Sequence, residues 1–178
     1  VSRFGCTENE ELRVRSSKCL AAAMYLLRGT PFIYQGEELG MTNVQYDIED
    51  YKDCEIINMY HERLEKGYSK DEIMKSIYAK GRDNARTPMQ WSDEANAGFT
   101  TAKPWLKVNE NYKAINVAAQ EKDPSSVLNY YRRLVALRKS DEFKELFTYG
   151  RCVPAYEDTD GIMAYYREDE NKRVLVVA

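Results

Sequence analysis

The stretch that decides the fold runs from Gly29 to Asn43 and reads GTPFIYQGEELGMTN. Residues 31–35, PFIYQ, form a short apolar run between two glycines, which is typical of a buried strand. Upstream, apolar residues recur at helical spacing from Leu12 to Leu27 and predict a helix over about 8–28. A helix, a tight Gly-Thr-Pro turn and a buried strand make up the repeating step of an α/β fold.

Two acidic residues, Glu37 and Glu38, follow the predicted strand at its carboxyl end, where parallel α/β sheets bind their ligands. Neighbouring residues of a strand point to opposite faces, so these carboxylates cannot flank one bond as acid and base. A structural ion pair is the favoured interpretation of the two residues.

A long excursion follows this step. Helical patterns cover about 49–66 and 69–79, and Ser69 with Glu72 forms a capping box for the second helix. Residues 81–123 show little periodicity and contain much Asn, Gly and Pro. A loop-rich insert of this length usually serves function.

The last part of the chain predicts a helix and then a β unit. An Asp-Pro-Ser sequence at 123–125 is a strong helix start, and apolar spacing carries that helix to about 139. Short alternating runs at 161–166 and 173–178, joined by polar turns, predict antiparallel strands.

Composition excludes several classes of protein. The 178 residues carry 26 basic and 29 acidic side chains, interspersed, with a net charge of −3, which excludes a basic nucleic-acid-binding surface. No apolar run approaches the roughly 20 residues of a membrane span, so no membrane partner is expected. No metal-ligand spacing is present, and neither a metal nor a cofactor is expected. The start lacks an initiator Met and the end reads like an interrupted strand, so we expect a fragment.

The spacing of the four cysteines matches neither a zinc module nor a disulfide framework. Cys19 falls in an apolar helical run, which predicts a buried, reduced thiol. The chain also contains no Asn-x-Ser/Thr glycosylation acceptor. These features favour a cytoplasmic protein.

The densest polar segment is GRDNARTPMQW at residues 81–91. An Arg fork and a Trp face would suit a carbohydrate pocket. On composition alone, however, the favoured interpretation is structural, with the Arg residues fixing a long loop and Trp91 anchoring the core. Asp53 and Glu55 are then expected on a solvated helix face, and His61, the only His, on the surface.

These motifs together resemble the α-amylase family. The stretch at 29–43 is similar to the eighth-strand segment of that family, and residues 81–91 with NAGFTT at 96–101 resemble its oligo-1,6-glucosidase branch. That branch includes dextran glucosidases, trehalose-6-phosphate hydrolases and bacterial α-glucosidases. The resemblance covers essentially the whole chain.

The resemblance implies an α/β fold, the C-terminal part of a (β/α)8 TIM barrel followed by the first strands of a small antiparallel β domain. Residues 1–144 would supply the seventh helix, eighth strand, excursion and eighth helix of the barrel, and residues 145–178 the start of a β-sandwich. It also implies a retaining mechanism with a nucleophilic Asp and an acid/base Glu. Both would precede this chain, so no catalytic residue is assigned to it.

The resemblance further implies two substrate-binding residues. Arg86 matches the Arg that holds the non-reducing-end glucose in the −1 pocket of relatives, where an Asp from an early barrel loop pairs with it. Glu55 matches a Glu near the +1 sugar that helps to read the α-1,6 linkage. The expected partners are an oligosaccharide substrate and the missing N-terminal part of the same enzyme.

Three interpretations stay open at this level. The first is an exo-acting α-glucosidase that hydrolyses short isomalto-oligosaccharides. The second keeps the enzyme class and takes trehalose 6-phosphate. The third is the non-enzymatic, glucosidase-like ectodomain of an amino-acid-transporter heavy subunit.

Overall fold

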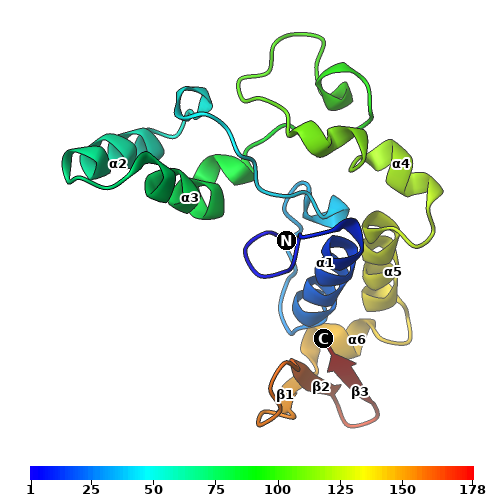
Figure 1. Ribbon diagram of the computed structural model, residues 1–178. Helices are drawn as coiled ribbons and strands as arrows, with labels where there is room; N and C mark the ends of the chain where they lie inside the picture. Colours follow the sequence, from blue (N-terminus) through cyan, green and yellow to red (C-terminus); the bar gives the residue numbers. More distant parts are fainter. The chain divides into compact units, whose positions relative to one another are not determined.

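The computed structural model describes residues 1–178, and the chain divides into two compact units (Figure 1). One unit holds residues 5–40 and 123–178, together with Val1, and the other holds 41–122 together with residues 2–4. The first contains α1 (Glu10–Tyr25), η1 (Glu37–Leu39), α5 (Val127–Lys139), α6 (Lys144–Tyr149), β1 (Arg151–Ala155), β2 (Ala164–Glu168) and β3 (Arg173–Val177). The second contains η2 (Ile48–Asp50), α2 (Cys54–Glu65), α3 (Lys70–Lys80), η3 (Arg82–Ala85), η4 (Ala95–Gly98), η5 (Glu110–Lys113) and α4 (Val117–Lys122).

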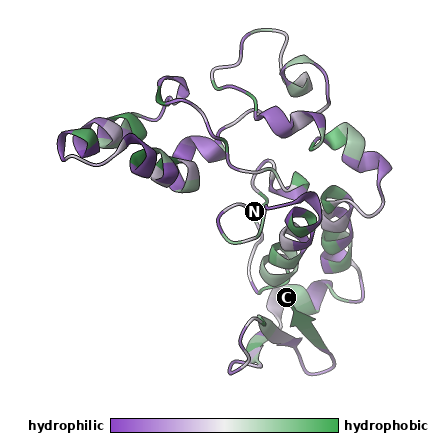
Figure 2. Ribbon diagram, viewed as in Figure 1, coloured by the Kyte–Doolittle hydropathy of each residue, from purple (hydrophilic) through white to green (hydrophobic).

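The first unit is built on the packing of α1 against α5 and of the small sheet against both α1 and α6. Figure 2 shows hydrophobic residues on α1, α5 and β3, the elements that meet in this core. The core combines aromatic and aliphatic side chains from all of these elements: Ala21, Tyr25, Leu26, Val127, Tyr131, Leu134, Phe147, Tyr165 and Val176. Tyr25 and Tyr131 lie with ring centroids 5.3 Å apart, which fixes α1 and α5 side by side.

Helix α1 begins later than the sequence pattern predicts. Asn9 is the N-cap, and its side chain accepts a hydrogen bond from the Leu12 amide. Four buried residues at intervals of four, Arg13, Ser17, Ala21 and Tyr25, define its inward face. Cys19 lies off this face and is exposed, so the prediction of a buried thiol was wrong.

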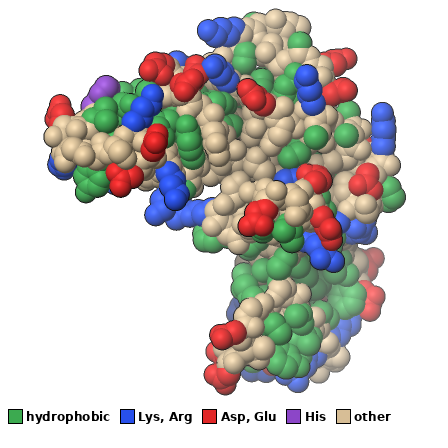
Figure 3. Space-filling model, in the orientation of Figure 1, with side chains coloured by type: hydrophobic (Ala, Val, Ile, Leu, Met, Phe, Trp, Pro, Cys, Tyr) green, Lys and Arg blue, Asp and Glu red, His purple; other side chains and the backbone are tan.

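The predicted strand at residues 31–35 is not a strand in this structure. Its side chains are exposed, with Phe32 at 86% and Tyr34 at 55% of their maximum. The physical reason is that a strand exists only when a neighbour satisfies its backbone groups, and no other segment of this chain pairs with these residues. They add to the hydrophobic side chains on the surface of this unit (Figure 3).

The two predicted strands form as β2 and β3 and are antiparallel, although β2 begins three residues later than predicted. A third strand, β1, was not predicted, and the sheet order is β1-β2-β3. Cys152 pairs with Arg167 across β1 and β2, and Tyr165 with Val176 across β2 and β3. Arg167 is fully buried, which the alternating pattern does not indicate. Its guanidinium donates to the carbonyl oxygens of Leu26 and Leu146, among others, and so satisfies the ends of α1 and α6.

The second unit is organised around a hairpin of the two helices α2 and α3. The predicted capping box is confirmed, because the Ser69 hydroxyl accepts from the Glu72 amide and the Glu72 carboxylate accepts from the Ser69 amide. Buried residues of both helices form a core with the preceding loop: Val44, Tyr46, Ile48, Tyr51, Ile56, Tyr60, Ile73, Met74, Ile77 and Leu106. His61 is exposed, as predicted. The predicted helix at 49–66 is two elements, η2 and α2.

Candidate functional site: a cluster of arginines and carboxylates

A close approach of α3 to α2 creates the site. Gly81 ends α3, and a β-carbon there would lie 2.8 Å from the Ile77 carbonyl oxygen and 2.9 Å from Ile56 Cδ1. Glycine therefore allows the chain to leave α3 directly against α2. The next residue, Arg82, lies beside Asp53 at the first turn of α2.

Asp53 is the centre of the cluster. It is the N-cap of α2, accepting from the Glu55 amide at 3.1 Å, and its side chain is 1% exposed. Arg82 donates to it twice, from Nε to Oδ2 at 2.7 Å and from Nη2 to Oδ1 at 2.6 Å. These hydrogen bonds from Arg82 are the main reason that the pKa of Asp53 lies below its ordinary value. The prediction that Asp53 lies on a solvated helix face was wrong.

Asp83 closes the network from the other side. Its Oδ2 accepts from the backbone amides of Lys52 at 2.7 Å and Asp53 at 2.9 Å, and the side chain is fully buried. Asn84 fixes the same loop by accepting from the Val44 amide at 3.0 Å. These two residues therefore have the structural role that composition alone suggests for the whole segment.

Arg86 differs from these two residues. Only its Nη1 atom approaches carboxylates, at 3.4 Å from Asp83 Oδ1 and 3.9 Å from Asp53 Oδ2. Its side chain is 38% exposed. The rest of the guanidinium fork is open and can donate to hydroxyl or carboxylate oxygens of a ligand.

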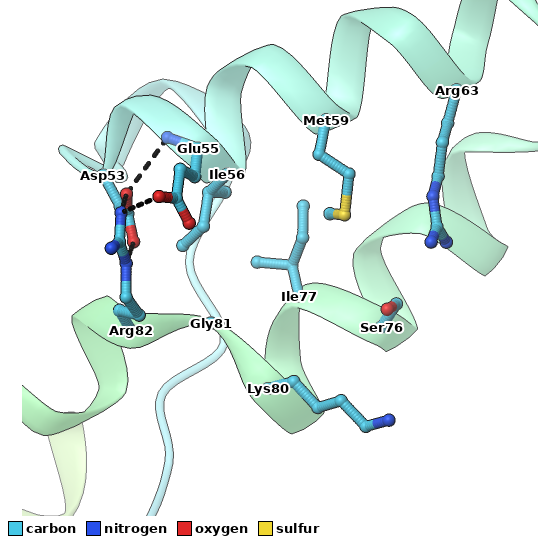
Figure 4. Close-up of a pocket in the computed structure, with 10 residues that line it drawn as sticks. All are labelled: Asp53, Glu55, Ile56, Met59, Arg63, Ser76, Ile77, Lys80, Gly81 and Arg82. Atoms are coloured by element: carbon cyan, nitrogen blue, oxygen red, sulfur yellow. Dashed lines mark hydrogen bonds and ion pairs between the residues drawn. The ribbon is translucent and has the colours of Figure 1, made fainter.

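Glu55 stands at the mouth of a pocket of about 310 Å³ between α2 and α3. Figure 4 shows Glu55, Ile56 and Arg82 at one end of this pocket, Met59, Ile77 and Lys80 between the ends, and Arg63 and Ser76 at the other end. The Glu55 side chain is 72% exposed, and its Oε1 lies 3.2 Å from Arg82 Nη2.

The structure brings the two predicted site residues into one network, because Glu55 and Arg86 both lie beside the Asp53–Arg82 pair. Glu55 lines the pocket and Arg86 does not. Trp91 is half-exposed, with 51% of its surface accessible, so it does not anchor a core. Arg82 and Asp53 were not predicted from the sequence as site residues. The sequence signal that could have indicated Asp53 is its position as the N-cap of α2.

The acidic pair after the predicted strand makes no ion pair, so that interpretation was wrong. Glu37 Oε1 and Glu38 Oε2 are buried without hydrogen-bond partners. Burial raises the pKa of both carboxyl groups.

No group of three or more His, Cys, Asp or Glu residues is arranged to hold a metal ion. None of the helices has the length and apolar character needed to cross a membrane.

Comparison with known proteins identifies the relatives of this chain. It is 51% identical over 179 residues to the probable oligo-1,6-glucosidase 2 of Bacillus subtilis and 50% identical over 179 residues to the oligo-1,6-glucosidase of Parageobacillus thermoglucosidasius. Each alignment covers 99% of this chain and 31% of the relative, so the chain spans about a third of their length. The trehalose-6-phosphate hydrolase of Bacillus subtilis is 44% identical over 178 residues, 99% of this chain and 31% of that protein.

Solved structures of related enzymes also match this chain over nearly its whole length. The trehalose-6-phosphate hydrolase of Bacillus licheniformis matches with a TM-score of 0.92 and 44% identity, covering 99% of this chain and 31% of that one. The E254Q mutant of MutB, solved in complex with sucrose, matches with a TM-score of 0.91 and 41% identity, covering 99% and 32%. A family model described as the catalytic domain of α-amylase matches residues 1–149. The chain therefore belongs to the α-amylase family.

Proposed function

We propose that this chain is part of a longer, exo-acting, retaining α-glucosidase that hydrolyses short α-glucosides, with the α-1,6 linkage of isomalto-oligosaccharides as its main target. The observation that carries this proposal is the half-open guanidinium of Arg86 beside two buried carboxylates, 3.4 Å from Asp83 and 3.9 Å from Asp53. Relatives named oligo-1,6-glucosidases, at 50–51% identity, support the same class of substrate.

The proposed fold is the C-terminal part of a (β/α)8 barrel in residues 1–144, followed by the start of a β-sandwich in residues 145–178. The exposed apolar segment at 31–35 supports the barrel assignment, since it has the composition of a buried strand and lacks a partner. The antiparallel sheet formed by β1, β2 and β3 supports the second part.

The proposed roles follow from the chemistry of the two side chains. Arg86 would donate hydrogen bonds to hydroxyl groups of the terminal glucose in the −1 pocket. Glu55 would accept hydrogen bonds from the +1 sugar at the mouth of the α2–α3 pocket. Ile56, Met59 and Ile77 add an apolar floor suited to the C–H face of a sugar ring.

The catalytic carboxylates are proposed to lie outside this chain. A retaining glycosidase needs two carboxyl groups about 5 Å apart, one of them free to act as the nucleophile. In the cluster, Asp53 is bonded to Arg82 and Asp83 to backbone amides. Glu55 is then the one exposed carboxylate of this cluster, and a single carboxylate cannot perform both roles.

Trehalose 6-phosphate is the second candidate substrate, favoured by the 44% identity to a trehalose-6-phosphate hydrolase.

We place the protein in the cytoplasm, supported by four free cysteines and the absence of glycosylation acceptors. The named relatives are enzymes, which favours an enzyme over a transporter subunit.

The test uses the full-length protein with isomaltose, maltose and trehalose 6-phosphate. We expect the highest kcat/KM on isomaltose and, by NMR, release of glucose first as the α-anomer. Preferential hydrolysis of trehalose 6-phosphate would select the second candidate. No hydrolysis of any of the three would contradict the enzyme assignment.

A further inference from the structure

The Nη2 atom of Arg82 is shared between two carboxylates of different exposure. It lies 2.6 Å from Oδ1 of Asp53, whose side chain is 1% exposed, and 3.2 Å from Oε1 of Glu55, whose side chain is 72% exposed. One guanidinium nitrogen thus connects the buried centre of the cluster to the acid at the pocket mouth (Figure 4).

The guanidinium plane is held in place by its other contacts. Nε donates to Asp53 Oδ2 at 2.7 Å, which makes the bond to Asp53 two-pointed and prevents the group from rotating. Asp53 is itself fixed, since it caps α2 through the Glu55 amide and its own amide donates to Asp83 at 2.9 Å. The Arg82 guanidinium is therefore held by a rigid support beside the Glu55 carboxylate, with which it forms an ion pair at 3.2 Å.

Glu55 has no comparable support of its own. It lies in the first turn of α2, and its carboxylate makes no ion pair other than the one with Arg82. An exposed Glu side chain samples several rotamers, and a binding group is more effective when a supporting residue fixes it before the ligand arrives.

We propose that Arg82 is a positioning residue for Glu55 and, through it, a determinant of which leaving-group sugar the enzyme accepts. This inference rests on the proposed α-glucosidase function and on the role of Glu55 at the +1 sugar. Arg82 holds the Glu55 carboxylate over the start of the pocket, where it accepts a hydrogen bond from a hydroxyl of the leaving-group sugar. A leaving group without sugar hydroxyls makes no use of this arrangement.

The experiment compares two substrates in the full-length enzyme: isomaltose, whose leaving group is a sugar, and p-nitrophenyl α-glucoside, whose leaving group is not. The variants are Arg82→Gln, Glu55→Gln and their combination. We expect each single variant to lower kcat/KM for isomaltose by roughly 10- to 100-fold, the usual effect of losing a hydrogen bond to a charged group. Activity on p-nitrophenyl α-glucoside should change less than about threefold, and the double variant should resemble Glu55→Gln, because coupled residues do not act additively.

Arg15→Gln is the matched control, since Arg15 forms an exposed Arg–Glu ion pair with Glu11, 3.5 Å long, on α1. It should leave the ratio between the two substrates unchanged. Arg82→Lys covers the case in which Arg82→Gln does not fold. It keeps a charge beside Asp53 but lacks the planar fork that makes the two-point bond to Asp53 and fixes the group beside Glu55, so it should also lose selectivity.

Equal loss on both substrates, an unchanged substrate ratio, or multiplying effects in the double variant would each overturn the inference. A failure of the proposed function looks different, because the wild-type protein would then hydrolyse neither substrate.

Discussion

Arg82 and Asp53 form a two-point hydrogen bond across 29 residues of sequence, with Nε 2.7 Å from Oδ2 and Nη2 2.6 Å from Oδ1. Asp53 is buried, and a buried carboxylate is stable only when charges and donors compensate its lost hydration. The pair therefore ties the start of α2 to the chain that leaves α3, and it places the site residues beside each other.

Replacing Asp53 by Asn should destabilise the full-length protein by about 1.5–3 kcal/mol at neutral pH, because charge-assisted hydrogen bonds to Arg82 are lost. The folded-state pKa of Asp53 lies below its ordinary value of 3.8, chiefly through Arg82. The ionised group therefore contributes stability above about pH 4, and this contribution is lost as the pH falls through the folded pKa. Urea unfolding at several pH values measures the difference between wild type and variant.

Asp93→Asn is the control for that measurement, because Asp93 is an exposed acid in the same unit. Its effect should be within about 0.5 kcal/mol at every pH. A difference between wild type and Asp53→Asn that stays constant down to pH 2 would contradict the assigned role of the Asp53 charge.

Replacing Arg86 by Ala in the full-length enzyme should lower kcat/KM on isomaltose by the equivalent of roughly 2–5 kcal/mol, the usual result of truncating one member of a paired charge in a binding site. The melting temperature should change much less, because the Arg86 side chain is 38% exposed and its contacts to Asp83 and Asp53 are long, at 3.4 and 3.9 Å. Arg86→Lys should restore little activity, since an ammonium cannot reproduce the fork. Near-normal kcat/KM together with a large drop in melting temperature would remove Arg86 from the site.

Arg167 should behave in the opposite way to Arg86. Its guanidinium is fully buried and donates to carbonyl oxygens at the ends of α1 and α6, so Arg167→Met leaves several acceptors unsatisfied. We expect a loss of about 3 kcal/mol or more in unfolding free energy, with unchanged KM in the protein that remains folded. Arg173→Met is the matched control, since Arg173 lies on β3 and its side chain is 58% exposed. A small effect at Arg167 would mean that water replaces its hydrogen bonds.

The 178-residue chain by itself should self-associate and show no glucosidase activity. Phe32, Ile33 and Tyr34 expose an unpaired apolar segment, and such segments recruit other chains. Size-exclusion chromatography with light scattering measures the association, and p-nitrophenyl α-glucoside measures residual activity. A compact monomer with a cooperative melt, or turnover comparable to that of a full-length relative, would show that the chain is more independent than we propose.

The sequence by itself determined the features that depend on near neighbours. The Ser69–Glu72 capping box forms as predicted because its two partners lie three residues apart on one helical turn. The antiparallel strands β2 and β3 could be predicted because alternation and polar turns are local signals. Membership of the α-amylase family could also be inferred from the sequence, because the family's motifs are contiguous stretches such as residues 29–43 and 81–91.

Only the tertiary structure decided where each charge lies and what pairs with it. Asp53 and Glu55 are two residues apart and chemically alike, yet one is buried and the other is 72% exposed, because Arg82 and Asp83 reach Asp53 from a distant part of the chain. Arg167 sits within an ordinary alternating strand, and its burial follows from the helix ends that surround it. The segment at 31–35 has the composition of a strand but no partner here, because strand formation depends on hydrogen bonds that a single segment cannot make with itself.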